Sequence, residues 1–296
     1  MKLDAARGAK AIEWASWGFA LLGLTLPIAL YSPPFALYRS ALESGVGLAQ
    51  GGLAEHAALV GLVSGITGGS IAGKWAMHAA IARFGLARRQ RWARDATLVG
   101  LLCWFAIDSA SSMLAGAWWN VAMVNAMPML VVGLPLALAW RELGQDDTLP
   151  PPLAAMEQPA RAVILSAGIG ACSGLVIAFG GGSFAFAPWF DGLVASGIVP
   201  GALSDTHRAL ALSFFGPIGG CVSAQFAMIV LAARGPLRAG ARWVAPASAA
   251  SILVWFVIDS SYGLAHGGLF NVLMVNVPTL LLTLPPLAWA HLRVRP

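Results

Sequence analysis

Eight apolar stretches, each long enough to cross a lipid bilayer, follow one another along this 296-residue chain. A membrane-spanning helix needs about 20 mostly apolar residues, because the hydrocarbon core of a bilayer is about 30 Å thick. The stretches cover residues 14–36, 57–82, 96–116, 119–140, 162–189, 208–233, 244–262 and 269–290. Backbone groups inside lipid must be hydrogen-bonded within the protein, which α-helices achieve. The sequence therefore predicts an all-α polytopic membrane protein with eight transmembrane helices.

The shortage of charge excludes the soluble classes of protein. Charged residues make up 10% of the chain and apolar residues 58%, against about 25% and 45–50% in soluble domains. A soluble enzyme, a disordered chain and a nucleic-acid-binding module are excluded, so the expected partner is the lipid bilayer and not nucleic acid. The three cysteines, Cys103, Cys172 and Cys221, lack the spacing of a metal site, and no catalytic motif is present. We expect neither an enzyme nor a metal or other cofactor.

The basic residues predict the orientation, because Lys and Arg gather in the cytoplasmic loops of membrane proteins. With the N-terminus in the cytoplasm, 15 of the 18 basic residues fall on the cytoplasmic side. These are Lys2, Arg7, Lys10, Arg83, Arg88, Arg89, Arg91, Arg94, Arg141, Arg161, Arg234, Arg238, Arg242, Arg293 and Arg295. Arginine outnumbers lysine 15 to 3, which is typical of a GC-rich bacterial genome. We expect a multi-pass protein of a bacterial cytoplasmic (inner) membrane, with both termini in the cytoplasm.

The chain contains an internal repeat. Residues 104–125 and 255–276 are identical at 11 of their 22 positions, at an offset of 151. We therefore expect a first four-helix repeat in residues 1–142, an acidic, proline-rich cytoplasmic linker in residues 143–160, and a second four-helix repeat in residues 161–296. Because four is an even number, both repeats have the same orientation, and their symmetry axis runs along the membrane normal.

Small residues recur every four positions in the second span of each half. In pairs at the offset of 151, they are Gly65 and Gly216, Gly69 and Gly220, and Gly73 and Ala224. Such spacing lets the backbones of two membrane helices approach closely. We expect close helix contacts along this face in both halves.

Asp108 and Asp259 are the only acidic residues inside the predicted spans, and they are repeat-equivalent. A charged residue in mid-membrane costs about 2.5–3.5 kcal/mol on insertion scales, so it usually faces the bundle interior or a water-filled cavity. Trp104 and Trp255 precede the two acids by four residues and share their helix face. An acid beside an aromatic ring suits the binding of a proton or a cationic group. The alternative is a structural role, with each carboxylate hydrogen-bonded to neighbouring serine and asparagine side chains.

Asparagines in the fourth span of each half form a second set of candidates. Asn125 and Asn276 are expected to lie level with the aspartates on the adjacent antiparallel helix, whereas Asn120 and Asn271 lie nearer the outer end. The deeper pair is therefore a candidate for binding a substrate or a proton. The alternative is hydrogen bonding between helices, worth about 0.6 kcal/mol for each bond.

Lys74 is the most asymmetric candidate, because the residue 151 positions later is Gln225. A lysine inside a span suits the coordination of an anion or a coupling role. Two alternatives are open. The long side chain can reach the cytoplasmic interface, or it can form an ion pair with Asp108.

Helix-breaking residues interrupt the first and the fifth predicted span at the same depth, at residues 31–34 and 180–183. Broken helices at corresponding positions of two halves are typical of a transporter site, and free backbone amides at such breaks bind anions. Gly181, Gly182 and Ser183 are therefore candidate binding residues. The alternative is a kink or a packing turn.

His56 and His207 stand at the outer start of the second span in each half, again at the offset of 151. Helix capping or anchoring at the membrane interface is one interpretation of the pair. A pH-sensitive outer gate is the other, because histidine titrates near neutral pH.

One part of the second half resembles a known family. The glycines at 180–182, Pro188 and the run at residues 209–213 are similar to the first two helices of a repeat in the TauE/SafE family. The resemblance implies an architecture of four plus four helices. It also implies the export of small sulfur-containing or organic anions.

Together these features favour a secondary transporter of a small solute, for which proton coupling is one option, with its site between the two repeats. The small solute is the expected molecular partner. The alternative is a non-catalytic scaffold or assembly subunit of a larger membrane complex. A membrane-protein partner and a homo-oligomer are both compatible with the sequence.

Overall fold

The computed structural model describes residues 3–294, in which eight helices are long and apolar enough to cross a membrane. They cover Ala5–Ala29, Gly52–Arg88, Arg91–Leu114, Trp118–Leu138, Ala154–Gly180, Asp205–Leu237, Val244–Ala265 and Leu269–Arg293. No strand occurs within the described part of the chain. The chain is thus an integral multi-pass membrane protein, and the predictions of eight spans and of an all-α fold are confirmed.

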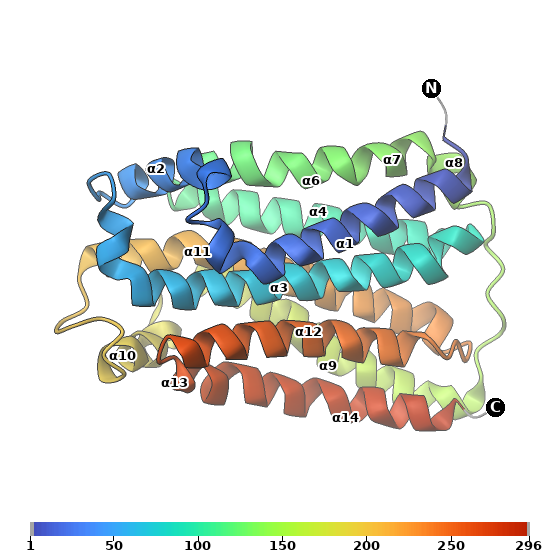
Figure 1. Ribbon diagram of the computed structural model, residues 1–296. Coiled ribbons are helices and arrows are strands. Elements are labelled where there is room, and N and C mark those ends of the chain that lie inside the picture. Colours follow the sequence, from blue (N-terminus) through green and yellow to red (C-terminus); the bar gives the residue numbers. More distant parts are fainter. Residues whose placement is uncertain (1–2, 295–296) are drawn as a thin grey trace.

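The spans are built from long helices joined by short ones (Figure 1). The long helices are α1 (Ala5–Ala29), α3 (Ala57–Phe84), α4 (Arg91–Leu114), α9 (Glu157–Gly180), α11 (Asp205–Ala232), α12 (Val244–Ala265) and α14 (Val277–Arg293). The fourth span consists of α5 (Trp118–Asn120), a π-helical turn, α6 (Ala126–Val131) and α7 (Gly133–Leu138), and the remaining short helices are α2 (Ala36–Gly45), α8 (Trp140–Leu143), α10 (Ala187–Ala195) and α13 (Leu269–Asn271).

Helices α3 and α11 form the centre of the bundle and are mostly buried. The two pack against each other, and each has two further close neighbours. The neighbours of α3 are α1 and α12, and the neighbours of α11 are α9 and α4. Each central helix therefore packs against the third span of the other half of the chain. The two halves are interleaved and do not lie side by side as separate bundles.

Glycines allow this close packing. A Cβ atom added at Gly68 of α3 would lie 2.3 Å from the carbonyl oxygen of Gly23 in α1, and one at Gly219 of α11 would lie equally close to that of Gly174 in α9. A Cβ atom at Gly73 would lie 2.9 Å from a carbonyl oxygen of α12. No side chain fits at these distances. Gly68 and Gly219 lie outside the predicted small-residue face. The close contacts of that face are confirmed by Gly73 and by Gly220, where an added Cβ atom would lie 3.0 Å from the carbonyl oxygen of Trp104 in α4.

The first and the fifth helix end earlier than predicted. Helix α1 covers Ala5–Ala29 and not residues 14–36, and α9 covers Glu157–Gly180 and not residues 162–189. Each end is followed by a serine, Ser32 or Ser183, whose hydroxyl donates a hydrogen bond of 2.6 Å to the last carbonyl of the helix. A 3₁₀ turn then leads into α2 or α10.

The predicted breaks therefore terminate the spans and do not interrupt them. Ser32 and Ser183 make the same hydrogen bond and are 151 positions apart. The two breaks therefore correspond with a shift of two positions from the expected alignment of residues 31–34 with residues 180–183. At the other end of α1, Arg7 and Lys10 lie inside the helix, whose first turn is capped by Asp4. Lys2 and Arg295 belong to the predicted cytoplasmic set but lie outside the described residues.

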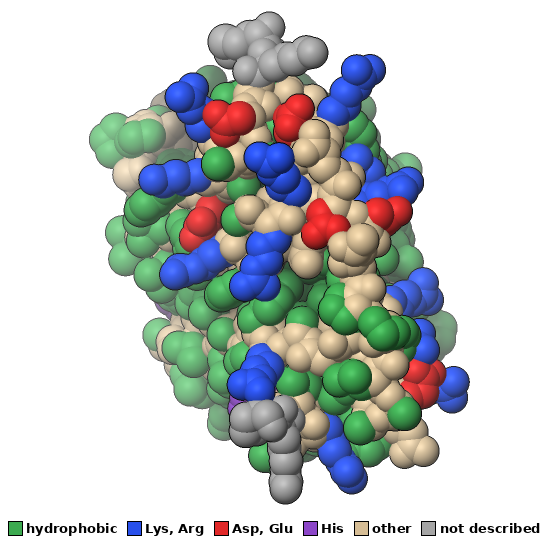
Figure 2. Space-filling view, turned by 90° about the vertical axis from the view of Figure 1, so that its right-hand side faces the viewer, with side chains coloured by type: hydrophobic (Ala, Val, Ile, Leu, Met, Phe, Trp, Pro, Cys, Tyr) green, Lys and Arg blue, Asp and Glu red, His purple; other side chains and the backbone are tan. Residues whose placement is uncertain are grey.

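Helix α1 begins and α14 ends at the same end of the bundle, where the linker between the halves also lies (Figure 1). Figure 2 shows Lys and Arg side chains gathered on this end, with Asp and Glu between them. The linker is fixed to the loop before α4, because the N–H of Arg91 donates to the carbonyl of Asp146 at 2.9 Å. Farther along, the N–H of Leu153 donates to the carbonyl of Arg238 at 2.8 Å. The linker thus contacts loops of both halves.

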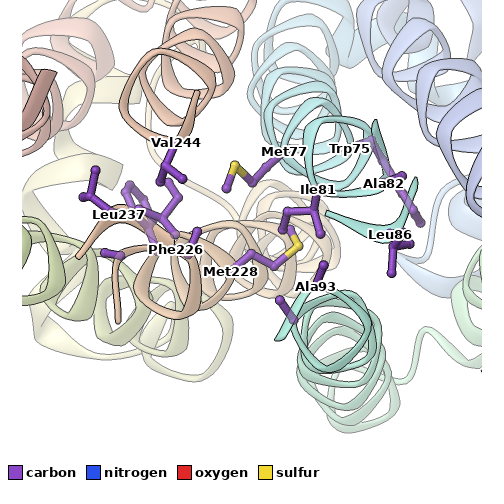
Figure 3. Close-up of a cluster of buried hydrophobic side chains, with 14 of the residues drawn as sticks. Trp75, Met77, Ile81, Ala82, Leu86, Ala93, Phe226, Met228, Leu237 and Val244 are labelled. Carbon is purple, nitrogen blue, oxygen red and sulfur yellow. The ribbon is translucent and has the colours of Figure 1, made fainter. Parts of the chain in front are cut away.

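The apolar core lies between the central helices near this charged end (Figure 3). Met77 of α3 and Met228 of α11, 151 positions apart, are both fully buried there. Phe226 and Ile81 pack in the same cluster. A second large buried cluster, which includes Leu62 and Phe215, also combines residues of both halves, so the apolar core is not divided between the halves.

Candidate functional site

Asp108 lies at the centre of a buried polar cluster. Its side chain is 1% exposed, and one carboxylate oxygen, Oδ1, accepts hydrogen bonds from Ser112 Oγ at 2.9 Å and from Asn120 Nδ2 at 2.8 Å. The same amide of Asn120 also lies 3.0 Å from Ser112 Oγ. Helix α4 supplies the acid and the serine, and α5 supplies the amide. The carboxylate is therefore bound by the next helix along the chain.

Asp259 of α12 lies in a matching cluster in the second half. Its Oδ1 atom accepts hydrogen bonds from Asn271 Nδ2 at 3.0 Å and from Asn276 Nδ2 at 2.9 Å. Asn276 Nδ2 also donates to Ser260 Oγ at 3.0 Å. Since Asp259 is 1% exposed, both acids are enclosed and both have amide partners.

The two clusters differ in their deeper asparagine. Asn276 binds Asp259 directly, as predicted, whereas Asn125 donates its amide to Ser109 Oγ at 3.2 Å. The Oδ1 atoms of Asn125 and Asn276 are buried without a hydrogen-bond partner. Asn120 and Asn271, which the sequence placed nearer the outer end, bind the acids in both halves.

A π-helical turn explains how Asn271 and Asn276 both reach Asp259 in the second half. The turns cover Val121–Asn125 and Val272–Asn276, where the backbone hydrogen bonds join residues five apart. Two residues five positions apart point in different directions on an α-helix but share a face across such a turn. Pro128 and Pro278 follow soon after. A proline removes one backbone donor and clashes with the preceding turn, which a local widening of the helix relieves.

Both acids lie where the two halves meet. A Cβ atom added at Gly220 of α11 would lie 3.0 Å from the Cβ of Asp108. One added at Gly69 of α3 would lie 3.1 Å from the Cβ of Asp259. Each acid is therefore packed against a glycine of the other half, and these glycines are 151 positions apart.

Lys74 is completely buried, with 0% of its side chain exposed. Its Nζ atom lies 3.5 Å from the ring centroid of Trp75 and 4.1 Å from that of Trp104, and it has no hydrogen-bond partner in the described structure. The expectation that this side chain reaches the cytoplasmic interface is wrong, because neighbouring helices enclose it. The expected ion pair with Asp108 is absent from the described ion pairs. The two indole rings hold the cation instead.

The turn after α9 lies apart from Lys74. Gly181 packs against Phe215, Gly182 has open space where a side chain would begin, and the Ser183 hydroxyl is bound to the carbonyl of Gly180. Among the described residues, no hydrogen bond or ring contact joins this turn to Lys74. The expectation that both act on one anionic group therefore has no support from these contacts.

A cavity of about 70 Å³ reaches Asp259. Asn271, Ser70, Trp255 and Trp189 also line it, and Trp189 Nε1 donates to Asn271 Oδ1 at 3.0 Å. Its volume has room for a few water molecules. The sequence predictions missed Trp189. A signal was available, because the residue 151 positions earlier is Tyr38, another aromatic side chain with a polar tip.

His56 and His207 meet at the end of the bundle opposite the termini. Their ring centroids are 4.9 Å apart with the planes at 86°. His207 also caps α11, with its Nδ1 atom 2.8 Å from Ser204 Oγ. The prediction of a capping role is confirmed for His207. The contact between the rings adds a second point at which the halves meet.

Comparison with known proteins gives no relative, because no family model, no curated protein and no solved structure matches the chain. The resemblance to the TauE/SafE family stays an expectation. The functional argument therefore rests on the geometry described above.

Proposed function

We propose that the chain is a secondary transporter of a small solute, built from two copies of a four-helix unit with its site between them. The observation that carries this proposal is the pair of buried acid–amide clusters at Asp108 and Asp259. They lie 151 positions apart, and each packs against a glycine of the other half. Ionisable residues buried in a membrane protein are expensive and typically mark ion or substrate pathways.

The two acids have different roles in this proposal. Asp259 lines a cavity with room for water, which suits a group that exchanges protons or binds a cationic group of the solute. Asp108 lies on the same helix as Trp104, one of the two rings that hold the ammonium of Lys74. Lys74, for its part, suits the binding of an anionic group once the surrounding helices separate.

The proposed orientation places both termini and the linker in the cytoplasm of a bacterial inner membrane. The charged end of the bundle supports it, because that end carries Arg141 and Arg161 on either side of the linker and the arginines of the loops before α4 and α12 (Figure 2). A basic excess of this kind is typical of the cytoplasmic side.

A non-transporting membrane subunit is the second candidate. The indole rings of Trp14 and Trp17 on α1 favour it, because they are 67% and 46% exposed. Tryptophan is enriched at protein interfaces, where a partner helix would cover such rings. In this case the acid–amide clusters only hold helices together.

Flux measurements separate the two candidates. The purified protein is reconstituted in liposomes with a pH-sensitive dye inside, and a panel of small organic anions and cations is added outside. We expect at least one solute to move protons with the wild type. This flux should be lost with Asp108→Asn, Asp259→Asn and the double variant.

The control is Asp191→Asn, the same change at an exposed acid of α10, which should keep the flux. Thermal unfolding of each variant is measured in parallel. Wild-type protein that moves no solute, with the two buried-acid variants unfolding at lower temperature than the control, would contradict transport and support the structural subunit.

A further inference from the structure

A lateral cavity lies on the side of the second half. It has a volume of about 870 Å³ and lies between α9, α11, α12 and the last span. Gly168 and Cys172 line it from α9, Gln225 from α11, and Thr279 from α14. The volume falls in the range of about 300–1,000 Å³ that is usual for sites of small molecules.

Among residues 3–294, no charged side chain lines this cavity. The hydroxyls of Ser173, Thr279 and Thr283 each donate to a carbonyl of their own helix, at 2.7–3.0 Å. Besides the thiol of Cys172 and the indole of Trp255, the lining contains the amide of Gln225, whose Nε2 atom donates to Ser251 Oγ at 3.2 Å. Because transfer of a charge into apolar surroundings is strongly unfavourable, the occupant must be uncharged, with its polar end at Gln225.

The lining of this cavity differs from the corresponding part of the first half. Gly170 and Gln225 stand 151 positions after Phe19 and Lys74. In the first half, Phe19 stacks on Trp75 with ring centroids 4.7 Å apart, and both rings are buried. In the second half a glycine replaces Phe19, so the stacked pair is missing, and the ring of Phe226 packs directly on Gly170, with a ring carbon 2.6 Å from the position of an added Cβ atom.

The depth of the cavity in the bundle indicates from where its occupant enters. Its lining on α9 extends over residues 164–177 of a helix that covers Glu157–Gly180, so the cavity lies midway along the span. The head groups of bilayer lipids lie beyond the ends of the spans, and only their hydrocarbon chains reach this depth. A molecule that brings a polar group to Gln225 must be dissolved in the hydrocarbon core.

The cavity also adjoins the one that reaches Asp259. The residues that line both are Ile177, Phe186, Val222, Trp255 and Val275. We propose that the lateral cavity binds an uncharged, lipid-soluble amphiphile that enters head first. Its hydrogen-bonding head lies at Gln225, toward the polar cluster, and its apolar body lies between α9 and α14. This site is separate from the proposed transport of a solute, and its occupancy is measured directly, without any flux.

The test uses a photoreactive probe, a twelve-carbon alcohol with a diazirine in its chain. The full-length protein in lipid nanodiscs is irradiated with the probe, and the labelled peptides are identified by mass spectrometry. We expect labelling in residues 164–177 and 274–283. Matched probes with a carboxylate or a quaternary ammonium head should label these peptides several-fold less.

Gly168→Trp is the filling variant, because Gly168 lines the cavity and a Cβ atom added there has nothing within 4 Å. Labelling should fall several-fold. Gly18→Trp is the matched control on α1, where the added Cβ atom is equally unobstructed, and labelling should be unchanged. Gln225→Leu should weaken labelling by the alcohol and leave that by a diazirine-labelled alkane unchanged.

Two outcomes would overturn the proposal. Equal labelling by a diazirine-labelled phosphatidylcholine and by the alcohol, with Gln225→Leu without effect on either, would show that ordinary lipid chains fill the cavity. Labelling by the alcohol that Gly168→Trp does not reduce would place the probe elsewhere. Both outcomes are independent of whether the protein transports a solute.

Discussion

At the scale of single residues, Lys74 is one of several buried groups without a hydrogen-bond partner in the described structure. Two indole rings hold its ammonium, which has no hydrogen-bond partner in the described structure. Cation–π contacts contribute about 0.5–2 kcal/mol, whereas burial of an ion costs several kcal/mol after relaxation. The lysine therefore weakens the fold, which favours a role in function over a role in stability.

Replacement of Lys74 by methionine should raise the free energy of unfolding by about 1–3 kcal/mol, because the loss of the buried charge outweighs the lost ring contacts. Thermal unfolding in detergent measures the change. Lys10→Met, at an exposed position of α1, is the matched control and should change little. A lower unfolding temperature for Lys74→Met would show that the lysine holds the helices together.

The asparagines at this scale show what the sequence could and could not predict. Repetition at an offset of 151 identified the two acids and, as candidates level with them, Asn125 and Asn276; of this pair, Asn276 is hydrogen-bonded to an acid and Asn125 to Ser109. It did not identify Asn120 and Asn271 as hydrogen-bond partners of the acids, because two side chains five positions apart on a regular α-helix point in different directions. The π-helical turns restore the alignment, and they could not be predicted from the hydrophobic pattern.

At the scale of elements, the π-helical turn should allow the removal of one residue between the two asparagines without loss of their alignment. Deletion of Leu273, which is 58% exposed, shortens the spacing of Asn271 and Asn276 from five residues to four. Four residues share a face on a regular α-helix. We expect this variant to keep both hydrogen bonds to Asp259 and to unfold within about 1 kcal/mol of the wild type.

The control is deletion of Leu281, 70% exposed and inside the regular helix α14. This deletion rotates the two parts of the helix by about 100° with respect to each other, since α-helices have about 3.6 residues per turn. It should destabilise the protein clearly more. Equal losses for the two deletions would show that the turn itself, and not the alignment of the asparagines, is needed.

The linker is the element whose stability should depend on pH. The hydroxyl and the backbone N–H of Thr148 donate to the carboxylate of Asp146 and hold its pKa below the usual value. Since the pKa is lowered in the folded state, the contact stabilises the linker above the unfolded pKa of about 3.9 and is lost as the pH falls through the folded value.

Hydrogen exchange in residues 144–153, corrected for intrinsic rates, should therefore accelerate between about pH 5 and pH 3. Thr148→Val removes the hydroxyl donor and should reduce this acid dependence. An acceleration of the same size in Thr148→Val would assign the effect to other carboxyl groups.

At the scale of the whole molecule, the sequence predicted the number of spans but not their neighbours. The length of each apolar run is sufficient to define a span, as the eight helices confirm. The choice of neighbouring helices depends on a few close contacts, such as those of Gly69 with Asp259 and of Gly220 with Asp108. Either pairing, within a half or between halves, satisfies the same apolar pattern, so the interleaving could not be predicted.

Because the halves are interleaved, a cut in the linker should not separate them. A protease site placed at the exposed residues 150–152 would be cleaved in the purified protein. The two fragments should elute together on size-exclusion chromatography in mild detergent, at the volume of the uncut chain. Elution as two separate species would contradict the packing of α3 on α12 and of α11 on α4.

This packing also determines which parts of the molecule can move as rigid bodies. The natural mechanical units are not the two halves of the gene product. One unit contains α1, α3 and α12, the other contains α9, α11 and α4, and each draws helices from both ends of the sequence. Helix α14 contacts α9 of one unit and α12 of the other. Any sliding of one unit past the other would therefore strain the last span, next to the turn that carries Asn276.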